Sequence, residues 1–197
     1  MDAVDDWNSL KEGTRLAVGQ LLDQLNSETS TEDLLDSYLY AKRRLAESMQ
    51  AFMRANSTAP GETFSNIRGQ IQAAISDRFT GEIPDRYLKV PYGSRVHGEL
   101  FAVLLQRQGS PVEADLLRVI TGDSVHTERR VRELRELGLD IQTTKHSGYD
   151  HYTLGSLNVD ASMIPSIIAN LIRRDPGLSQ AQKQILLTRV SEVTPLA

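Results

Sequence analysis

Apolar side chains recur every three or four residues over most of the first eighty positions, which is the spacing of an amphipathic helix. One such run spans Val4 to Leu25 and ends at the polar stretch 26–31. A second run begins after Ser30, a residue type that caps helices, and continues to about Ala55. We therefore expect two helices that pair as an antiparallel hairpin.

A third helical run ends at Phe79, and two more occupy the last forty residues. A Pro-Gly pair predicts a loop over 56–63, and the prolines and glycines of 80–93 predict a connector. The last helix is expected to start at Ser179, because Gln182 three residues later completes a capping box.

Residues 94–155 carry several local signals in a fixed order. An apolar helix stopped by Gly109 comes first, and Ser110-Pro111-Val112-Glu113 then has the composition of a helix start. A short second helix is followed by a third, expected from Ser124 to Leu137. Two strand-like segments then flank His146-Ser147-Gly148-Tyr149, the pattern of a hairpin with glycine in the turn. Three helices followed by a hairpin describe a winged helix-turn-helix.

The third of these helices would turn its charged side outward. A helical wheel places Val131, Leu134 and Leu137 together on the inward side. In a winged helix the third helix can enter the DNA major groove, while the hairpin tip reaches phosphate or the minor groove. Arginine pairs with guanine or phosphate through two hydrogen bonds. The residues expected to contact DNA are Ser124, Val125, Arg129, Arg130 and Arg132 of the helix, and Lys145 and His146 of the hairpin.

The same charges also fit a solvated helix surface. Glu128 and Arg132, Arg129 and Glu133, and Arg132 and Glu136 are each four residues apart, which is the spacing of ion pairs along one helix. In this alternative the surface is self-paired or binds another protein.

Composition limits the chemistry that the chain can carry. It has no cysteine, which excludes a disulfide and a thiolate zinc site. No apolar run reaches the length of a membrane span and the start is acidic, so we expect a cytoplasmic protein that does not contact membranes. The net charge of −4 argues against non-specific coating of nucleic acid. Any binding of nucleic acid would therefore use a localised basic surface.

Candidate catalytic and metal-binding residues are few. His97-Gly98-Glu99 has the His-x-Glu form of zinc deaminases but lacks their cysteine pair. His146, Asp150 and His151 lie on the expected hairpin, where neighbouring positions face opposite ways. We expect no enzyme activity, no cofactor and no metal ion. A nuclease whose site the sequence does not reveal is the least favoured alternative.

An arginine-rich run occupies the expected third helix and reads Glu128-Arg129-Arg130-Val131-Arg132-Glu133-Leu134-Arg135-Glu136-Leu137-Gly138. It is followed by Leu139-Asp140-Ile141 and Tyr152-Thr153-Leu154. This pattern resembles the winged helices appended to HNH-type and methyl-directed restriction endonucleases. In that family the module binds DNA beside a separate nuclease. The flanking regions show no HNH pattern, so the resemblance implies a DNA-binding module and says little about cleavage.

The expected fold is mainly α, with a helical N-terminal region, a connector, a winged helix domain and a C-terminal helical pair at 1–79, 80–93, 94–157 and 158–197 respectively. The expected function is binding of double-stranded DNA, as a transcription regulator or as the recognition subunit of a restriction or defence system. The alternative is a non-catalytic assembly subunit that binds protein through its winged helix and helical ends. The N-terminal hairpin has more apolar positions than two helices bury alone, so we expect a homo-oligomer or a protein partner there. A dimer would suit two DNA half-sites about one helical turn apart.

Overall fold

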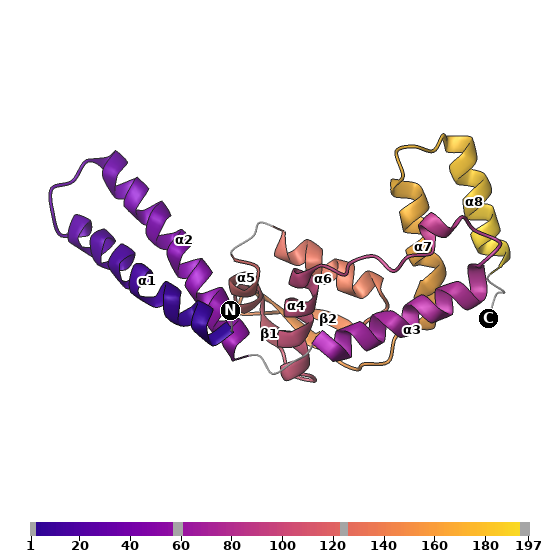
Figure 1. The fold of residues 1–197 in the computed structure, drawn as a ribbon, viewed down its shortest axis with the longest axis horizontal. Helices are drawn as coiled ribbons and strands as arrows, with labels where there is room; N and C mark the ends of the chain where they lie inside the picture. Colours follow the sequence, from indigo (N-terminus) through magenta and orange to yellow (C-terminus); the bar gives the residue numbers. More distant parts are fainter. Residues whose placement is uncertain (1–2, 57–60, 123–125, 194–197) are drawn as a thin grey trace. The chain divides into compact units, whose positions relative to one another are not determined.

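The computed structural model describes three stretches of the chain: 3–56, 61–122 and 126–193. They belong to two compact units, Met1–Thr58 with Asp115–Thr127 and Ala59–Ala114 with Glu128–Ala197. The described residues are mainly helical with one small antiparallel sheet, which confirms the expected fold class (Figure 1). The four-part division expected from the sequence stays a prediction. Among the described helices, none is long and apolar enough to cross a membrane.

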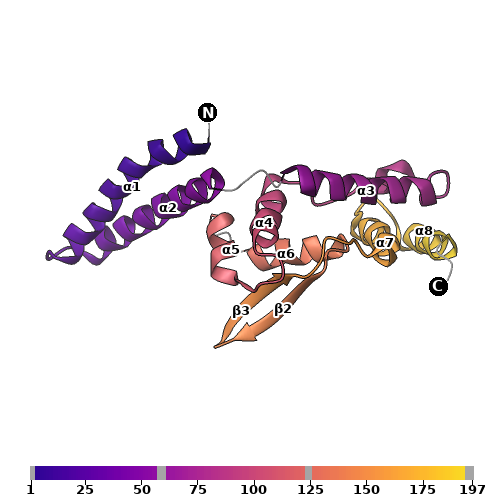
Figure 2. The ribbon, with the colours of Figure 1, turned by 90° about the horizontal axis from the view of Figure 1, so that it is seen from below.

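The first unit is built on a helical hairpin. Helices α1 (Ala3–Leu25) and α2 (Thr31–Ala55) lie side by side and antiparallel, as their apolar spacing predicts (Figures 1 and 2). The Ser30 hydroxyl accepts a hydrogen bond from the Asp33 backbone N–H at 3.1 Å and so caps α2 as expected. Helix α5 (Ala114–Ile120) is tied to α2 by a 2.7 Å hydrogen bond from the Gln50 side chain to the Ile120 carbonyl.

The second unit holds α3 (Gly61–Phe79), α4 (Arg95–Gln106) and most of α6 (Thr127–Glu136). Phe64 of α3 stacks on Phe101 of α4 with ring centroids 5.1 Å apart. Helix α3 begins inside the loop expected over 56–63, because buried Phe64 and Ile67 extend its inward side to the first turn. Residues 57–60 of that loop lie outside the described residues.

The sheet of this unit has three antiparallel strands in the order β1-β3-β2. They are β1 (Val112–Glu113), β2 (Ile141–His146) and β3 (Tyr149–Leu154). Val112 pairs with Tyr152, and all four side chains of the pairs Val112–Tyr152 and Ile141–Leu154 are buried. Figure 2 shows β2 and β3 as a ribbon whose turn points away from α3 and α4.

The helix start expected at Ser110-Pro111-Val112-Glu113 is wrong. Val112 and Glu113 form β1, and the helix begins only at Ala114. Val112 is fully buried, and its backbone pairs with a strand forty residues further along the chain. A long-range strand pairing therefore overrides the local helix preference of this segment.

The C-terminal part begins with short helix η2 (Ala161–Met163) and α7 (Ile164–Arg174), followed by α8 (Gln180–Glu192). The capping box of Ser179 and Gln182 is present as predicted. Within the expected connector, short helix η1 (Asp85–Tyr87) is followed by buried Leu88, so this segment is packed into the second unit.

Candidate nucleic-acid interface

Helix α6 has one buried and one exposed side. Val131, Leu134 and Leu137 are fully buried, as the helical wheel predicts. Arg129 and Arg132 are exposed on the opposite side. Burial of the apolar stripe therefore fixes which side of α6 the arginines present to solvent.

Glu133 lies inside the protein rather than on a solvated helix surface. Glu133 and His97 of α4 are 3% and 2% exposed, and Glu133 Oε2 lies 2.9 Å from His97 Nε2. The Arg129 Nε–H donates to Glu133 Oε1 at 3.0 Å, and the Arg130 guanidinium donates to Oε2 at 2.9 Å. The pairing of Arg129 with Glu133 is thus present, as the four-residue spacing indicates. The carboxylate is not solvated, however, because it is buried against His97 of α4.

The His97 ring connects this carboxylate to the start of α4. Its Nδ1 lies 2.7 Å from the Ser94 hydroxyl, which completes a chain from Ser94 through His97 to Glu133. Burial lowers the pKa of His97, so the ring is neutral at pH 7. An ionised carboxylate only accepts hydrogen bonds, so we assign the proton to Nε2 and let Nδ1 accept from Ser94.

Burial opposes the charge of Glu133, but three hydrogen bonds outweigh it. Donors on His97, Arg130 and Arg129 together hold the pKa of Glu133 below its ordinary value. The carboxylate is therefore ionised at neutral pH, and its contact with His97 is a charge-assisted hydrogen bond to a neutral ring.

Glu136 does not pair with Arg132, although the two residues are four positions apart on α6. It accepts a hydrogen bond from the Tyr92 hydroxyl, and Arg174 of α7 lies 3.3 Å from its Oε2. Burial first, and then the hydrogen bond to Glu136, raise the pKa of Tyr92. Tyr92 has a positive φ of 59°, which turns the chain just before α4.

Of the arginines of α6 that are predicted to contact DNA, Arg132 is consequently the one that is not held by another side chain of the described residues. Within the described stretches it forms no hydrogen bond or ion pair, whereas Arg129 and Arg130 are held by Glu133. Ser124 and Val125, the other two residues predicted on this helix, lie outside the described residues.

Lys145 and His146, the remaining residues predicted to contact DNA, lie on the β2–β3 hairpin. Lys145 and His146 are exposed at the end of β2. The turn residues Ser147 and Gly148 have φ angles of 52° and 87°, and positive φ at both positions is the requirement of a type I′ hairpin turn. Lys145 Nζ lies 3.8 Å from Asp150 Oδ1 on the opposite strand.

The histidines of the hairpin meet each other rather than an acidic residue. The rings of His146 and His151 lie edge to face with centroids 6.1 Å apart. Asp150 faces Lys145 instead, as alternation along a strand requires. No group of three or more metal-ligating side chains gathers here or elsewhere among the described residues.

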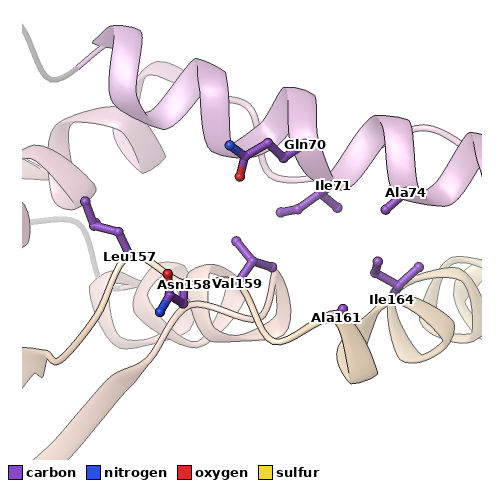
Figure 3. Close-up of a pocket in the computed structure, with 8 residues that line it drawn as sticks. All are labelled: Gln70, Ile71, Ala74, Leu157, Asn158, Val159, Ala161 and Ile164. Carbon is purple, nitrogen blue, oxygen red and sulfur yellow. The ribbon is translucent and has the colours of Figure 1, made fainter.

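A cavity of about 290 Å³ lies between α3 and the segment that leads from the sheet to α7. Figure 3 shows Gln70, Ile71 and Ala74 of α3 facing Val159 and Ile164 across it. Its lining contains two amide side chains, those of Gln70 and Asn158, and no ionisable group. These residues offer neither a nucleophile nor a base.

One region of the chain matches a family of known proteins. No curated protein and no solved structure matches the chain. The matched region starts within α4, ends in η2, and includes α6 and the whole sheet. Residues 98–161 are similar to the family described as KpnI N-terminal domain.

Proposed function

We propose that this chain binds double-stranded DNA with α6 and the β2–β3 hairpin, in the manner of a winged helix. The observation that carries the proposal is the orientation of α6, whose apolar stripe is buried while Arg129 and Arg132 face solvent. The element order α4, β1, α5, α6, β2, β3, with β1 paired to β3, supports the proposal. The sequence pattern predicted only the two strands of the hairpin, and β1 is a third strand that pairs with β3.

The arginines of α6 have different parts in this proposal. Arg132 has no partner among the described residues and is assigned to a base edge in the major groove, where arginine pairs with guanine. Arg129 and Arg130 are oriented by the buried Glu133 carboxylate, which suits contacts with phosphate at fixed positions. Glu133 is then a positioning residue that does not itself touch DNA.

The hairpin supplies the second contact of the proposal. Lys145 and His146 sit beside the two-residue turn Ser147-Gly148, and Lys145 is assigned to a backbone phosphate. Its proximity to Asp150 weakens the local positive charge, so its contribution to affinity is small.

The biological setting is inferred from the family match. The KpnI N-terminal domain is related to restriction endonucleases, and the matched residues contain α6 and the sheet. We therefore favour the recognition subunit of a restriction or defence system over a free-standing transcription regulator. We also propose that the chain itself performs no catalysis. Magnesium-dependent nicking of a plasmid that His151→Ala abolishes would refute this part.

A second candidate is an assembly subunit that uses the same surfaces for protein contacts. Two observations favour it: the net charge of −4, and the pairing of Arg129 and Arg130 with an acidic residue of their own helix. Both lower the positive potential that DNA would meet.

Fluorescence anisotropy with a labelled duplex separates the two candidates. The DNA-binding proposal predicts saturable binding at low salt that weakens as salt rises, because each phosphate contact releases counterions. Absence of binding to any duplex at low salt would contradict it and favour the assembly subunit. A single-stranded oligonucleotide of the same composition serves as the control.

A further inference from the structure

The longest run of consecutive basic residues in the sequence, Lys42-Arg43-Arg44, lies on α2. Lys42 and Arg43 are exposed, and Arg44 is half-buried. The same helix begins with the acids Glu32 and Asp33, so the positive charge is confined to one turn. In a chain of net charge −4, a localised basic surface of this kind is where an anionic partner would bind.

Lys42 and Arg43 line a groove of about 500 Å³ that lies entirely within the first unit. Thr121 and Gly122, which directly follow α5, line it from the other side. The remaining lining residues all belong to α2 and are Leu39, Ala46, Glu47 and Gln50. The groove is therefore placed where α2 meets the turn that follows α5, and we call it the basic groove.

The acid of the basic groove does not cancel its positive charge. Glu47 Oε2 accepts a hydrogen bond from the Arg44 guanidinium at 2.9 Å, so this carboxylate is already neutralised by its own helix. The Ile120 carbonyl at the end of α5 is occupied as well, by the Gln50 side chain at 2.7 Å. Arg43 forms no hydrogen bond or ion pair within the stretches that the structure describes. The groove thus keeps a net positive charge and an arginine that is free to bind an anion.

The basic groove adjoins the start of α6. The hydroxyl of Thr121, which lines the groove, lies 2.6 Å from the hydroxyl of Thr127, the first residue of α6. Both threonines are buried, so this contact is part of the interior of the first unit. Gly122 turns the chain with a φ of 62°, and a Cβ at this position would lie 3.8 Å from the Gln50 amide of α2. The same turn is therefore flanked by α2 and by the start of α6.

We propose that the basic groove binds the phosphate backbone of the duplex that α6 reads, with Lys42 and Arg43 as the contacting residues. This inference rests on the proposed function, which brings DNA to the exposed side of α6, and it adds a contact outside the winged helix. Phosphate suits the two side chains, because a guanidinium donates two parallel hydrogen bonds to it and an ammonium binds it as a point charge. Phosphate contacts fix the position of a protein on the duplex and carry no sequence information. The α2 helix accordingly contributes affinity and register, and α6 reads the sequence.

Fluorescence anisotropy of the full chain with two unrelated labelled duplexes, at several salt concentrations, tests this inference. The double variant Lys42→Ala, Arg43→Ala should bind both duplexes more weakly and to the same extent, and its salt slope should fall by about one unit for each side chain removed. The matched control Lys11→Ala, Arg15→Ala removes the same charge from exposed positions of α1 and should bind like wild type. Arg43→Lys keeps the charge and should keep the salt slope.

A backbone-cleavage experiment covers the case in which the alanine variants do not fold. The chain has no cysteine, so Arg43→Cys introduces a single thiol to which an iron–EDTA reagent can be attached. The iron at this position should cut the bound duplex within a short stretch of its backbone. The same reagent on Arg15→Cys of α1 should leave the duplex uncut.

Failure of this inference differs from failure of the proposed function. A wild-type protein that binds no duplex would overturn both. Wild-type affinity and salt slope in the Lys42, Arg43 double variant would overturn the basic groove alone and leave DNA binding by α6 intact. An equal loss in the Lys11, Arg15 control would also overturn it, because the effect would then come from the total charge of the hairpin.

Discussion

His97 Nε2 and Glu133 Oε2 lie 2.9 Å apart in the protein interior and join α4 to α6. The same carboxylate holds Arg129 and Arg130, so one buried acid both locks α6 in place and orients two of its arginines. Under the proposed function, this one side chain therefore couples stability to DNA recognition.

Removal of this carboxylate should destabilise the fold. Glu133→Ala leaves the buried His97 N–H without an acceptor, so we expect a loss of roughly 1–3 kcal/mol in the free energy of unfolding. Glu133→Gln keeps an acceptor oxygen and should lose less. Urea denaturation measures both, with exposed Glu82→Ala as the control that should change little. Equal stability of Glu133→Ala and wild type would refute the anchoring role.

Stability should fall on acidification because of the same pair. The folded-state pKa of His97 is lowered by burial, so below about pH 6.5 the unfolded chain binds a proton that the folded chain refuses. The lowered pKa of Glu133 acts in the same direction at more acidic pH, since protonation of this carboxylate is also easier in the unfolded chain. Urea denaturation at pH 7.5 and pH 5.5 should show part of this loss in wild type and not in His97→Gln. The same pH dependence in both proteins would contradict this assignment.

The buried stripe of α6 should carry far more stability than its exposed side. Leu134 is fully buried, so Leu134→Ala should cost roughly 2–5 kcal/mol through lost contacts and the cavity it leaves. Arg132→Ala should leave the thermal midpoint almost unchanged, because Arg132 is exposed and unpaired among the described residues. A comparison of the two variants by differential scanning calorimetry checks this order.

Lys145 should behave as a phosphate contact. Lys145→Ala should weaken binding equally for all duplex sequences and lower the salt slope by about one unit. Asp150→Asn should have the opposite effect, because it removes the carboxylate 3.8 Å from the lysine ammonium. Titrations of two unrelated duplexes at several salt concentrations measure both effects. A sequence-dependent loss in Lys145→Ala would show that this side chain reads bases instead.

Two helix caps and one turn of this protein follow from local patterns that the sequence displays directly. Ser30 and Ser179 cap α2 and α8 where their hydroxyls and the following residues predict, and the Ser147-Gly148 turn separates β2 from β3. These features depend on residues within a few positions of each other, which is why the pattern suffices to place them.

The features that the sequence did not reveal depend on contacts between distant positions. Strand β1 exists because Val112 pairs with Tyr152, and Glu133 is buried because His97 meets it from α4. Along α6 alone, Glu133 looks like any acid spaced for an ion pair with Arg129. The sequence offers one hint of this burial, since Glu133 is next to Leu134 and three residues from Arg130. The burial itself depends on His97, which is distant in the sequence.

The most direct test of the central claim is duplex binding by the double variant Arg129→Ala, Arg132→Ala, measured by fluorescence anisotropy at two salt concentrations. If both side chains contact DNA, the affinity should fall at both salts, by roughly 1–3 kcal/mol for each base contact removed. A charge-matched control, Arg78→Ala with Arg189→Ala, removes two exposed arginines from α3 and α8 and should bind like wild type. Wild-type affinity in the Arg129, Arg132 double variant would show that α6 does not read DNA.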